Sequence, residues 1–220
     1  MLKIENLAKK FGNRVILDRI SLTLEEGKAV AIFGESGSGK TTLLNIVSTL
    51  LSADEGSLVL NEQRYSEFNK KKKEAYRIAN FAYISPEANL LSPLNGKENI
   101  LFPLELQKLS FSEDDFKPIE EKLELTPFLN ESVDTLSSGE QQRIAIARAL
   151  TLKKRVLIAD EPTSHLDAEL ASVVMDLIKE EAKKNGTIVL CSCHDRSLLG
   201  KFDEVYFLEN GVLSENEKTA

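Results

Sequence analysis

Apolar and polar residues alternate in two stretches near the start of the chain, residues 2–7 and residues 20–24. A period of two residues is typical of strands that bury one face. Residues 28–33 form a short apolar run that ends at a glycine, which is the pattern of a strand buried on both faces. Apolar residues then recur at helical spacing over residues 41–51, which predicts a helix with one apolar stripe. Further strand-like patterns follow at residues 57–60 and 78–85.

The pattern changes after residue 85. Residues 86–154 contain helical patterns, acidic patches and scattered prolines, with no convincing strand. Strand patterns return at residues 155–159 and 187–193, on either side of a helical pattern over residues 168–184. Asn210-Gly211 is a strong turn dipeptide and predicts a closing hairpin. Because strands alternate with helices, we expect an α/β fold with a mainly parallel sheet.

Length and composition favour one globular domain. The 220 residues are 42% hydrophobic and 29% charged, so the chain can bury a core without disulfides. We expect a single domain over residues 1–220, with residues 1–85 and 155–220 as the core and residues 86–154 as a helical subdomain. The only cysteines, Cys191 and Cys193, are two residues apart on a predicted strand, too constrained to pair easily, which fits a reducing compartment. With His194 they could be metal ligands, but four ligands at zinc spacing are absent.

The charge balance limits the partners. A net charge of −7 argues against nucleic-acid binding, which needs clustered Lys and Arg. The one dense basic run, residues 70–73, is followed by Glu74 and predicts a solvated helix start. The first five residues do not have the pattern of a signal peptide, and no apolar run approaches the roughly 20 residues that span a bilayer. Any work at a membrane is therefore expected to go through a partner.

The strongest motif lies between the buried strand and the helix that follows it. It reads Gly34, Glu35, Ser36, Gly37, Ser38, Gly39, Lys40 and Thr41. This spacing matches the phosphate-binding loop G-x-x-x-x-G-K-[ST], whose glycines let backbone N–H groups surround phosphate oxygens. We expect Lys40 to reach the β- and γ-phosphates of ATP and Thr41 to offer its hydroxyl to Mg²⁺. The alternative is a glycine-rich turn without a ligand, which the strand–loop–helix context disfavours.

A second strand pattern ends in two carboxylates. Residues 156–159 are apolar and are followed directly by Asp160 and Glu161. Ligands of open α/β sheets bind at the carboxyl ends of the strands. We expect Asp160 to hold the Mg²⁺ shell and Glu161 to polarise the attacking water. The alternative, a solvated acidic turn, is weakened by the presence of the phosphate loop in the same chain.

A third motif points to one family of ATPases. It reads Leu136, Ser137, Ser138, Gly139, Glu140, Gln141, Gln142 and Arg143. This segment resembles the signature motif of ABC-type ATPases, which other phosphate-loop enzymes lack. A serine and a glycine at a helix N-terminus would form a second anion-binding site, whereas the simpler alternative is that Ser137 only caps the helix. The resemblance covers essentially the whole chain, and residues 140–143 and 159–163 are most similar to the lipoprotein-release, macrolide- and bacteriocin-export group.

The resemblance implies roles for further residues. Phe11 is similar to the aromatic residue that stacks on adenine, although a place in the core is the usual alternative for such a ring. Thr42 belongs to the nucleotide-binding set, together with Ser137 and Gly139. His194 follows a predicted strand directly and resembles the histidine that contacts the γ-phosphate. Residues 164–167 resemble the loop that crosses the interface of the family's dimers.

Two departures from the family pattern stand out. Pro86 occupies the position of a glutamine that precedes the helical part in family members, and proline offers neither an amide side chain nor a backbone N–H. Glu87 is the alternative source of that contact, although a carboxylate beside phosphates changes the local charge. Ser138 stands where glycine is usual, so its Cβ would crowd a close backbone approach.

The resemblance implies a phosphate-loop α/β core with an antiparallel strand layer from the N-terminal part, in an ATPase that powers transport. Two copies, or one copy and a similar ATPase, would sandwich two ATP molecules, each site pairing Lys40 of one chain with Ser137 of the other. Hydrolysis would drive a separate transmembrane permease subunit from the cytoplasmic face of the cell membrane, in an exporter of peptide, lipid or drug-like substrates. One alternative is a regulatory, weakly hydrolysing subunit, which Pro86 suggests and the retained Glu161 and His194 oppose. A soluble ABC protein that acts on ribosomes or DNA is opposed by the absence of a second such domain or a coiled-coil insert.

Overall fold

The computed structural model describes residues 1–215, and its larger sheet has six strands in the order β10-β9-β3-β8-β7-β6. These strands are β3 (Ala29–Phe33), β6 (Phe81–Ile84), β7 (Val156–Asp160), β8 (Ile188–Cys193), β9 (Glu204–Glu209) and β10 (Val212–Ser214). Neighbouring strands are parallel except in the β9–β10 hairpin. Asn210 and Gly211 both have positive φ in that hairpin, as their turn dipeptide predicted. The expected α/β fold with a mainly parallel sheet is confirmed.

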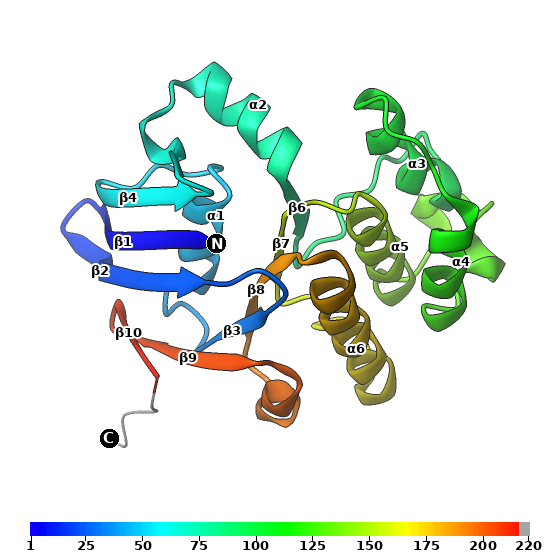
Figure 1. The fold of residues 1–220 in the computed structure, drawn as a ribbon. Coiled ribbons are helices and arrows are strands. Elements are labelled where there is room, and N and C mark those ends of the chain that lie inside the picture. Colours follow the sequence, from blue (N-terminus) through cyan, green and yellow to red (C-terminus); the bar gives the residue numbers. More distant parts are fainter. Residues whose placement is uncertain (216–220) are drawn as a thin grey trace.

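A smaller antiparallel sheet lies beside the larger one (Figure 1). Its order is β2-β1-β4-β5, with β1 (Leu2–Phe11), β2 (Arg14–Leu24), β4 (Glu55–Leu60) and β5 (Gln63–Arg64). Strands β1 and β2 are longer than the alternating stretches predicted. Their pairing shifts register at three places between Ile4 and Lys10. Each irregularity breaks the two-residue period, so the hydrophobic pattern reveals only part of each strand.

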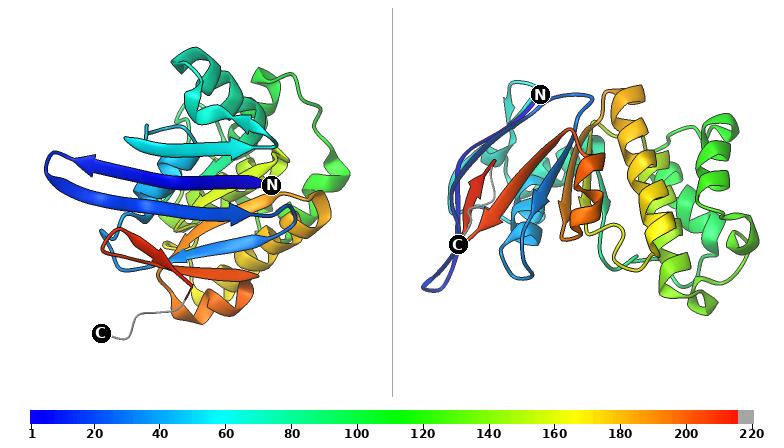
Figure 2. Two further views of the ribbon diagram at one scale, coloured as in Figure 1. Left: turned by 60° about the vertical axis from the view of Figure 1, so that its left-hand side comes forward. Right: turned by 90° about the horizontal axis from the view of Figure 1, so that it is seen from below.

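Helix α1 (Lys40–Val47) packs between the two sheets, as the views from the side and from below show (Figure 2). Its buried residues Leu43, Leu44 and Ile46 belong to one apolar cluster with residues of β1 and β3. The helix ends at Val47 rather than at residue 51, because Ser48 Oγ donates to the Leu44 carbonyl and the next residue turns to positive φ. This packing holds α1, including its first residue Lys40, against the larger sheet.

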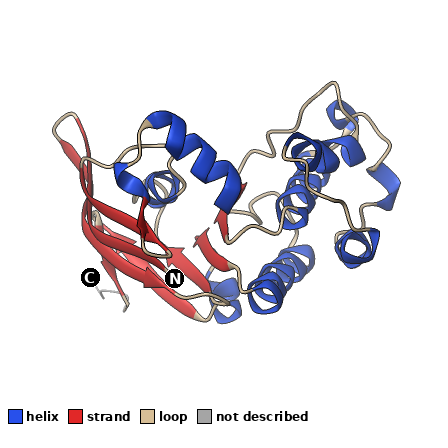
Figure 3. Cartoon of the chain, turned by 45° about the horizontal axis from the view of Figure 1, so that its top comes forward, coloured by secondary structure: helices blue, strands red, loops and turns tan. Residues whose placement is uncertain are grey.

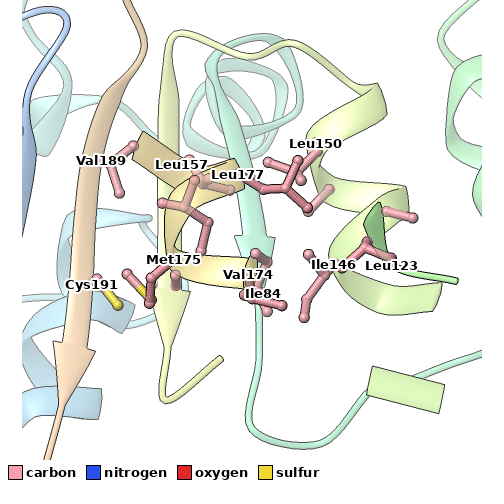
Figure 4. Close-up of a cluster of buried hydrophobic side chains, with 14 of the residues drawn as sticks. Ile84, Leu123, Ile146, Leu150, Leu157, Val174, Met175, Leu177, Val189 and Cys191 are labelled. Atoms are coloured by element: carbon pink, nitrogen blue, oxygen red, sulfur yellow. The ribbon is translucent and has the colours of Figure 1, made fainter. Parts of the chain in front are cut away.

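The opposite face of the larger sheet is covered by α5 (Ser138–Thr151) and α6 (Ala168–Asn185). Figure 4 shows the apolar contact between these layers, with side chains from β6, β7 and β8 meeting side chains from both helices. Leu157 of β7 points to this face, whereas Ile158 belongs to the cluster around α1. Strand β7 is therefore buried on both faces, which explains its continuous apolar run.

Helices occupy the part of the chain between residues 86 and 154 (Figure 3). They are α3 (Gly96–Leu106), α4 (Glu113–Lys122) and α5, with 3-10 turns at Thr126–Phe128 and Val133–Thr135. Within residues 86–154 the only β-pairing is an isolated bridge between Asn95 and Ser132. Further 3-10 turns lie at Tyr65–Glu67 and Arg196–Lys201. Among residues 1–215, no helix has both the length and the apolar character needed to cross a membrane.

The predicted start of the strand before residue 85 is also wrong. Residues 78–80, expected in a strand, are the last turn of helix α2 (Lys70–Asn80), and β6 begins only at Phe81. The short apolar run around Ile78 is compatible with either element, and the lysines before it extend the helix. Asn69 caps α2 by accepting from the Lys72 backbone, and none of its residues is buried. The solvated helix start that the basic run predicted is confirmed.

Candidate active site

The loop between β3 and α1 has a backbone that needs glycine at defined positions. Gly39 precedes α1 with φ 108°, a conformation that residues with a Cβ rarely adopt. A Cβ on Gly34 would lie 2.6 Å from the Leu208 carbonyl oxygen and 2.8 Å from Ser38 Oγ. Glu35, Ser36 and Gly37 form the exposed rim of this loop. The local fold therefore has the glycine requirements of a phosphate-binding loop, and it faces the start of a helix whose N–H groups attract anions.

Lys40 is the first residue of α1, and its side chain bonds to the backbone of the loop. Its side chain is 4% exposed, and Nζ donates to the carbonyl oxygens of Gly34 at 2.7 Å and Glu35 at 3.0 Å. The ammonium group is also 3.6 Å from Glu161 Oε1. A buried cation is stable only when polar groups surround it, and the loop carbonyls supply them here. They hold the positive charge under the loop, where it can meet an anion.

The carboxyl end of β7 places two acidic side chains beside the loop. Asp160 is fully buried, and its Oδ1 accepts a hydrogen bond of 2.6 Å from Ser192 Oγ on β8. Its Oδ2 is buried with no hydrogen-bond partner among residues 1–215. A buried carboxylate oxygen without a partner is rare, since desolvation costs free energy. Asp160 therefore offers one free oxygen toward a ligand.

Glu161 has an unusual backbone. Its φ is 45°, in the left-handed region, which costs a residue with a Cβ about 1 kcal/mol. The surrounding structure offsets this cost, because the Glu161 backbone N–H donates to Ser192 Oγ at 2.8 Å. The side chain is 28% exposed and lies 3.3 Å from Nδ1 of His194. Backbone strain of this kind clusters at functional sites.

Lys40, Glu161 and His194 thus form one cluster around the phosphate loop. The two carboxylate oxygens of Glu161 face different partners, with Oε1 toward Lys40 and Oε2 toward His194. His194 is the most exposed of the three, with 58% of its side chain accessible. The cluster contains a carboxylate, a cation and an imidazole next to the carboxyl ends of the central strands. Ligands of open α/β sheets bind at these strand ends.

A cavity of about 520 Å³ extends from the loop toward the helical part. Its lining comprises Thr41, Asn45, Leu50, Tyr83, Ser85, Pro86, Glu87, Asn89, Arg148 and Asp160. Thr41 and Asp160 both line it, and Asp160 Oδ2 has no hydrogen-bond partner within residues 1–215. Hydroxyl and carboxylate oxygens are the ligands that Mg²⁺ prefers, so these residues fit the ion expected from the sequence.

Phe11 lies at the end of β1 and is 53% exposed. The alternative of a core phenylalanine is therefore wrong. Lys9 Nζ is 5.3 Å from the centre of its ring. The same hairpin carries Ile16, whose side chain lies 3.0 Å from the position that a Cβ on Gly39 would take. The hairpin is thus packed against the phosphate loop, with an aromatic face left accessible to a planar ligand.

Ser137 and Gly139 lie at the N-terminus of α5. Ser137 and Glu140 form a capping box, in which Ser137 Oγ accepts from the Glu140 backbone and Glu140 Oε2 accepts from the Ser137 backbone. A Cβ on Gly139 would be 2.9 Å from the His165 carbonyl oxygen. The hydrogen bonds found for Ser137 in residues 1–215 stay within residues 137–141. A single chain therefore does not bring Ser137 to Lys40.

The cysteines are not a metal centre. Cys191 and Cys193 are both free and buried. Across residues 1–215, no group of three or more His, Cys, Asp or Glu residues is arranged to hold a metal ion. Burial raises the pKa of both thiols, most strongly for Cys191. They pack as small apolar side chains in the sheet.

Comparison with known proteins identifies the family. The ABC transporter family profile matches residues 17–164. The chain belongs to the ABC transporter family of ATPases. The lipoprotein-releasing system ATP-binding protein LolD of Pseudoalteromonas translucida (strain TAC 125) is 35% identical over 99% of this chain and 96% of its own length. The macrolide export ATP-binding/permease protein MacB of Campylobacter jejuni (strain 81-176) is 36% identical over 99% of this chain, which spans only 34% of that relative.

Solved structures of ABC cassettes have the same fold. The dimeric cassette MJ0796 in a post-hydrolysis state, bound to ADP and Pi, superposes with a TM-score of 0.86 at 28% identity over the full length of both chains. A second dimeric structure of MJ0796 gives the same values. The phosphate-loop core with an antiparallel layer and helices is therefore the ABC ATPase fold.

Some residues of the site escaped the sequence-based prediction. Ser192 bridges Asp160 and Glu161, and its only signal is a polar residue inside the apolar strand of residues 188–193. Gln142, which is 1% exposed, donates to the carbonyl oxygens of Ser85 and Pro162. It connects the signature helix of this family to both active-site loops.

Arg148 fixes the loop around Pro86 from the same helix. Its guanidinium donates to the carbonyl oxygens of Ala88 at 2.7 Å and Asn89 at 3.0 Å. Asn89 in turn donates to Ser85 Oγ and to the Glu87 carbonyl oxygen. The motif itself gave no reason to expect these contacts, because they depend on the tertiary packing of α5.

Proposed function

We propose that this chain is the ATP-hydrolysing subunit of an exporter of the LolD and MacB type. The observation that carries the proposal is the cluster of Lys40, Glu161 and His194 at the phosphate loop, with Glu161 Oε1 3.6 Å from Lys40 and Oε2 3.3 Å from His194. A cation and a base close together beside this loop support the proposal. Binding and hydrolysis of a nucleoside triphosphate need both groups.

The loop of residues 34–41 binds the phosphates. Its backbone N–H groups and those of the first turn of α1, which includes Thr42, surround the phosphate oxygens. Lys40 exchanges its contacts with loop carbonyls for contacts with the β- and γ-phosphates. The exposed ring of Phe11 stacks on the adenine.

Thr41 and Asp160 are the residues that would hold Mg²⁺. The free Oδ2 of Asp160 supports this assignment, because it is buried without another partner in residues 1–215. When bound with ATP, the ion neutralises charge that develops on the phosphate oxygens. The chain's own contribution is to fix Asp160 through Ser192 and to keep Thr41 on the first turn of α1.

Glu161 is the residue placed to act on the attacking water. It accepts a proton from the water as the water oxygen bonds to the γ-phosphorus, and the bond from that phosphorus to the β–γ bridging oxygen breaks. ADP leaves with the bridging oxygen, and inorganic phosphate carries the new one. His194, within 3.3 Å of Glu161, orients this carboxylate and contacts the γ-phosphate.

The complete site requires a second chain. Within residues 1–215 the hydrogen bonds of Ser137 stay within residues 137–141 of its own chain, and the related MJ0796 structures are dimers. We therefore propose that a second copy, or a similar ATPase, contributes its Ser137 and Gly139 to the ATP held by Lys40. Helix N-termini bind anions, which suits a contact with the γ-phosphate.

The transported substrate is chosen by another protein or segment. The relatives named for lipoprotein release and macrolide export favour an exporter, and a permease that spans the membrane would supply the substrate path. The chain would then work at the cytoplasmic face of the cell membrane, with no role for nucleic acid. Residues 86–154 form the helical subdomain that transmits nucleotide-dependent movement to the permease.

The test is Mg²⁺-dependent phosphate release from ATP by the purified chain, alone and with its permease. Release that needs both Mg²⁺ and Glu161 supports an ATPase subunit. ATP binding without turnover under either condition would instead make the chain a regulatory subunit, the second candidate that Pro86 favours. Absence of ATP binding would refute both.

A further inference from the structure

Tyr83 is a polar side chain in the cavity that the reaction described above does not use. It lies on β6, where it pairs with Ile158 of β7. Side chains two residues apart on a strand point to the same face, so Tyr83 and Asp160 share the face of the sheet that α1 covers. Both also line the cavity of about 520 Å³ next to the phosphate loop.

Asn45 fixes the orientation of the phenol. The Tyr83 hydroxyl donates to Asn45 Oδ1 at 3.0 Å. Asn45 follows Thr41 by one turn of α1, and residues four apart lie on the same face of a helix. Two side chains of α1 and two of the sheet therefore line the cavity together. They are Thr41, Asn45, Tyr83 and Asp160.

The hydrogen-bonding capacity of the phenol is only partly used. A tyrosine phenol is neutral at physiological pH, and it is both a donor and an acceptor of hydrogen bonds. Its proton goes to Asn45 Oδ1, so its oxygen can accept a hydrogen bond from a water molecule.

Pro86 makes this wall unusual. It lines the same cavity but has no polar side chain and no backbone N–H to offer. Asp160 Oδ2 is buried and without a hydrogen-bond partner in the described part of the chain. Tyr83 and Asn45 are neutral polar side chains that line this cavity together with Asp160 and Pro86.

We propose that Tyr83, held by Asn45, is a positioning residue for the hydrated divalent cation that enters with the nucleotide. Its hydroxyl donates to Asn45, so its oxygen accepts a hydrogen bond from a water molecule in the shell of that cation. This inference rests on the proposed function, because it assumes that Thr41 and Asp160 bind the ion. It gives the site a polar contact that Pro86 does not supply.

Packing alone is the competing explanation. Tyr83 contacts the apolar cluster around α1, and a phenylalanine would fill the same space. The substitution Tyr83→Phe separates the two, because it removes only the hydroxyl and keeps the ring. Asn45→Ala removes the acceptor that holds the hydroxyl while leaving the ring in place.

The experiment measures ADP affinity by calorimetry, once with Mg²⁺ and once with EDTA, for the parent and each variant. For Tyr83→Phe we expect an affinity about fivefold weaker with Mg²⁺, the loss of one neutral hydrogen bond, and an unchanged affinity with EDTA. Asn45→Ala should shift the Mg²⁺ value in the same direction. Tyr76→Phe is the matched control, because its hydroxyl donates to the Leu60 carbonyl at 3.3 Å, outside the cavity.

The outcomes are distinct. An unchanged Mg²⁺ affinity in Tyr83→Phe overturns the inference. An equal loss with Mg²⁺ and with EDTA also overturns it, because it shows a structural role for the hydroxyl. If the parent itself gains no ADP affinity from Mg²⁺, the assignment of Thr41 and Asp160 fails first, and this result differs visibly from a defect limited to the variants.

Discussion

Ser192 Oγ donates a hydrogen bond of 2.6 Å to Asp160 Oδ1 across the two central strands of the sheet. Ser192 Oγ also accepts a hydrogen bond of 2.8 Å from the backbone N–H of Glu161. One hydroxyl thus fixes the carboxylate proposed for the metal and the left-handed backbone that aims the proposed base. Orientation of catalytic groups by such contacts contributes to the rate without touching the substrate.

We predict that Ser192→Ala lowers both stability and turnover. Leaving the Glu161 N–H and Asp160 Oδ1 unpaired should cost about 1–3 kcal/mol in the free energy of unfolding. Turnover should fall further than stability explains, because Glu161 is released from its strained conformation. Chemical denaturation and steady-state ATPase assays measure the two effects.

Thr187→Val is the matched control for Ser192→Ala. Thr187 is also buried, and its hydroxyl donates to the Lys154 carbonyl at 3.1 Å, just before the opposite end of β8. The Thr187→Val variant should be less stable than the parent and should hydrolyse ATP at the parental rate. Equal turnover losses in both variants would show that Ser192 acts only through stability.

We predict that Glu161→Gln binds ATP and hydrolyses it about 10²-fold or more slowly, as expected for a lost general base. The amide keeps the size of the side chain and removes its charge. ATP-bound dimers should then accumulate and be visible in size-exclusion chromatography. Glu169→Gln, on the exposed first turn of α6, is the control and should match the parent. A Glu161→Gln variant with parental turnover would contradict the role.

We predict that Lys40→Ala weakens nucleotide binding about tenfold to a hundredfold, the range for hydrogen bonds to a charged group, and abolishes turnover. Lys40 also bonds the carbonyl oxygens of Gly34 and Glu35, so the loop should lose order while the sheet stays folded. Lys28→Ala is the control, since Lys28 pairs with Glu204 at 2.7 Å next to the opposite end of β3. Calorimetric ADP titration separates the two variants, and equal affinities would refute the assignment.

The parts of the site that follow from local sequence were predictable. The glycines of residues 34–39 impose a conformation by themselves, and the apolar run of β7 delivers Asp160 and Glu161 to its carboxyl end. The hairpin at Asn210 and Gly211 is equally local, because both residues take positive φ there. In these places propensity and tertiary structure agree.

The remaining parts depend on packing that a linear pattern does not contain. The Ser192–Asp160 bond requires the β7–β8 register, and the Tyr83–Asn45 bond requires the placement of α1 over β6. Register shifts in β1 hide half of that strand from the alternation rule. The role proposed for Ser137 depends on a second chain, since its own chain leaves it in a capping box.

The loop around Pro86 carries the last prediction. The Glu87 carbonyl accepts hydrogen bonds from Ser85 Oγ and Asn89, while Arg148 binds the next two carbonyls. Proline fixes its own φ near −65° and restricts Ser85 before it. The loop is therefore held rigidly, and we expect slow basal hydrolysis by the isolated chain.

Pro86→Gln should raise basal hydrolysis, because it restores a polar side chain to the cavity and frees the backbone. Glu87→Ala should leave turnover near the parental value, because the loop is held through the Glu87 carbonyl, which this substitution keeps. If instead the Glu87 carboxylate has replaced the glutamine contact, Glu87→Ala is damaging and Pro86→Gln is nearly silent. Steady-state ATPase assays on both variants, with and without the permease, decide between these outcomes. No change in either variant under either condition would show that this loop does not reach the reacting phosphate.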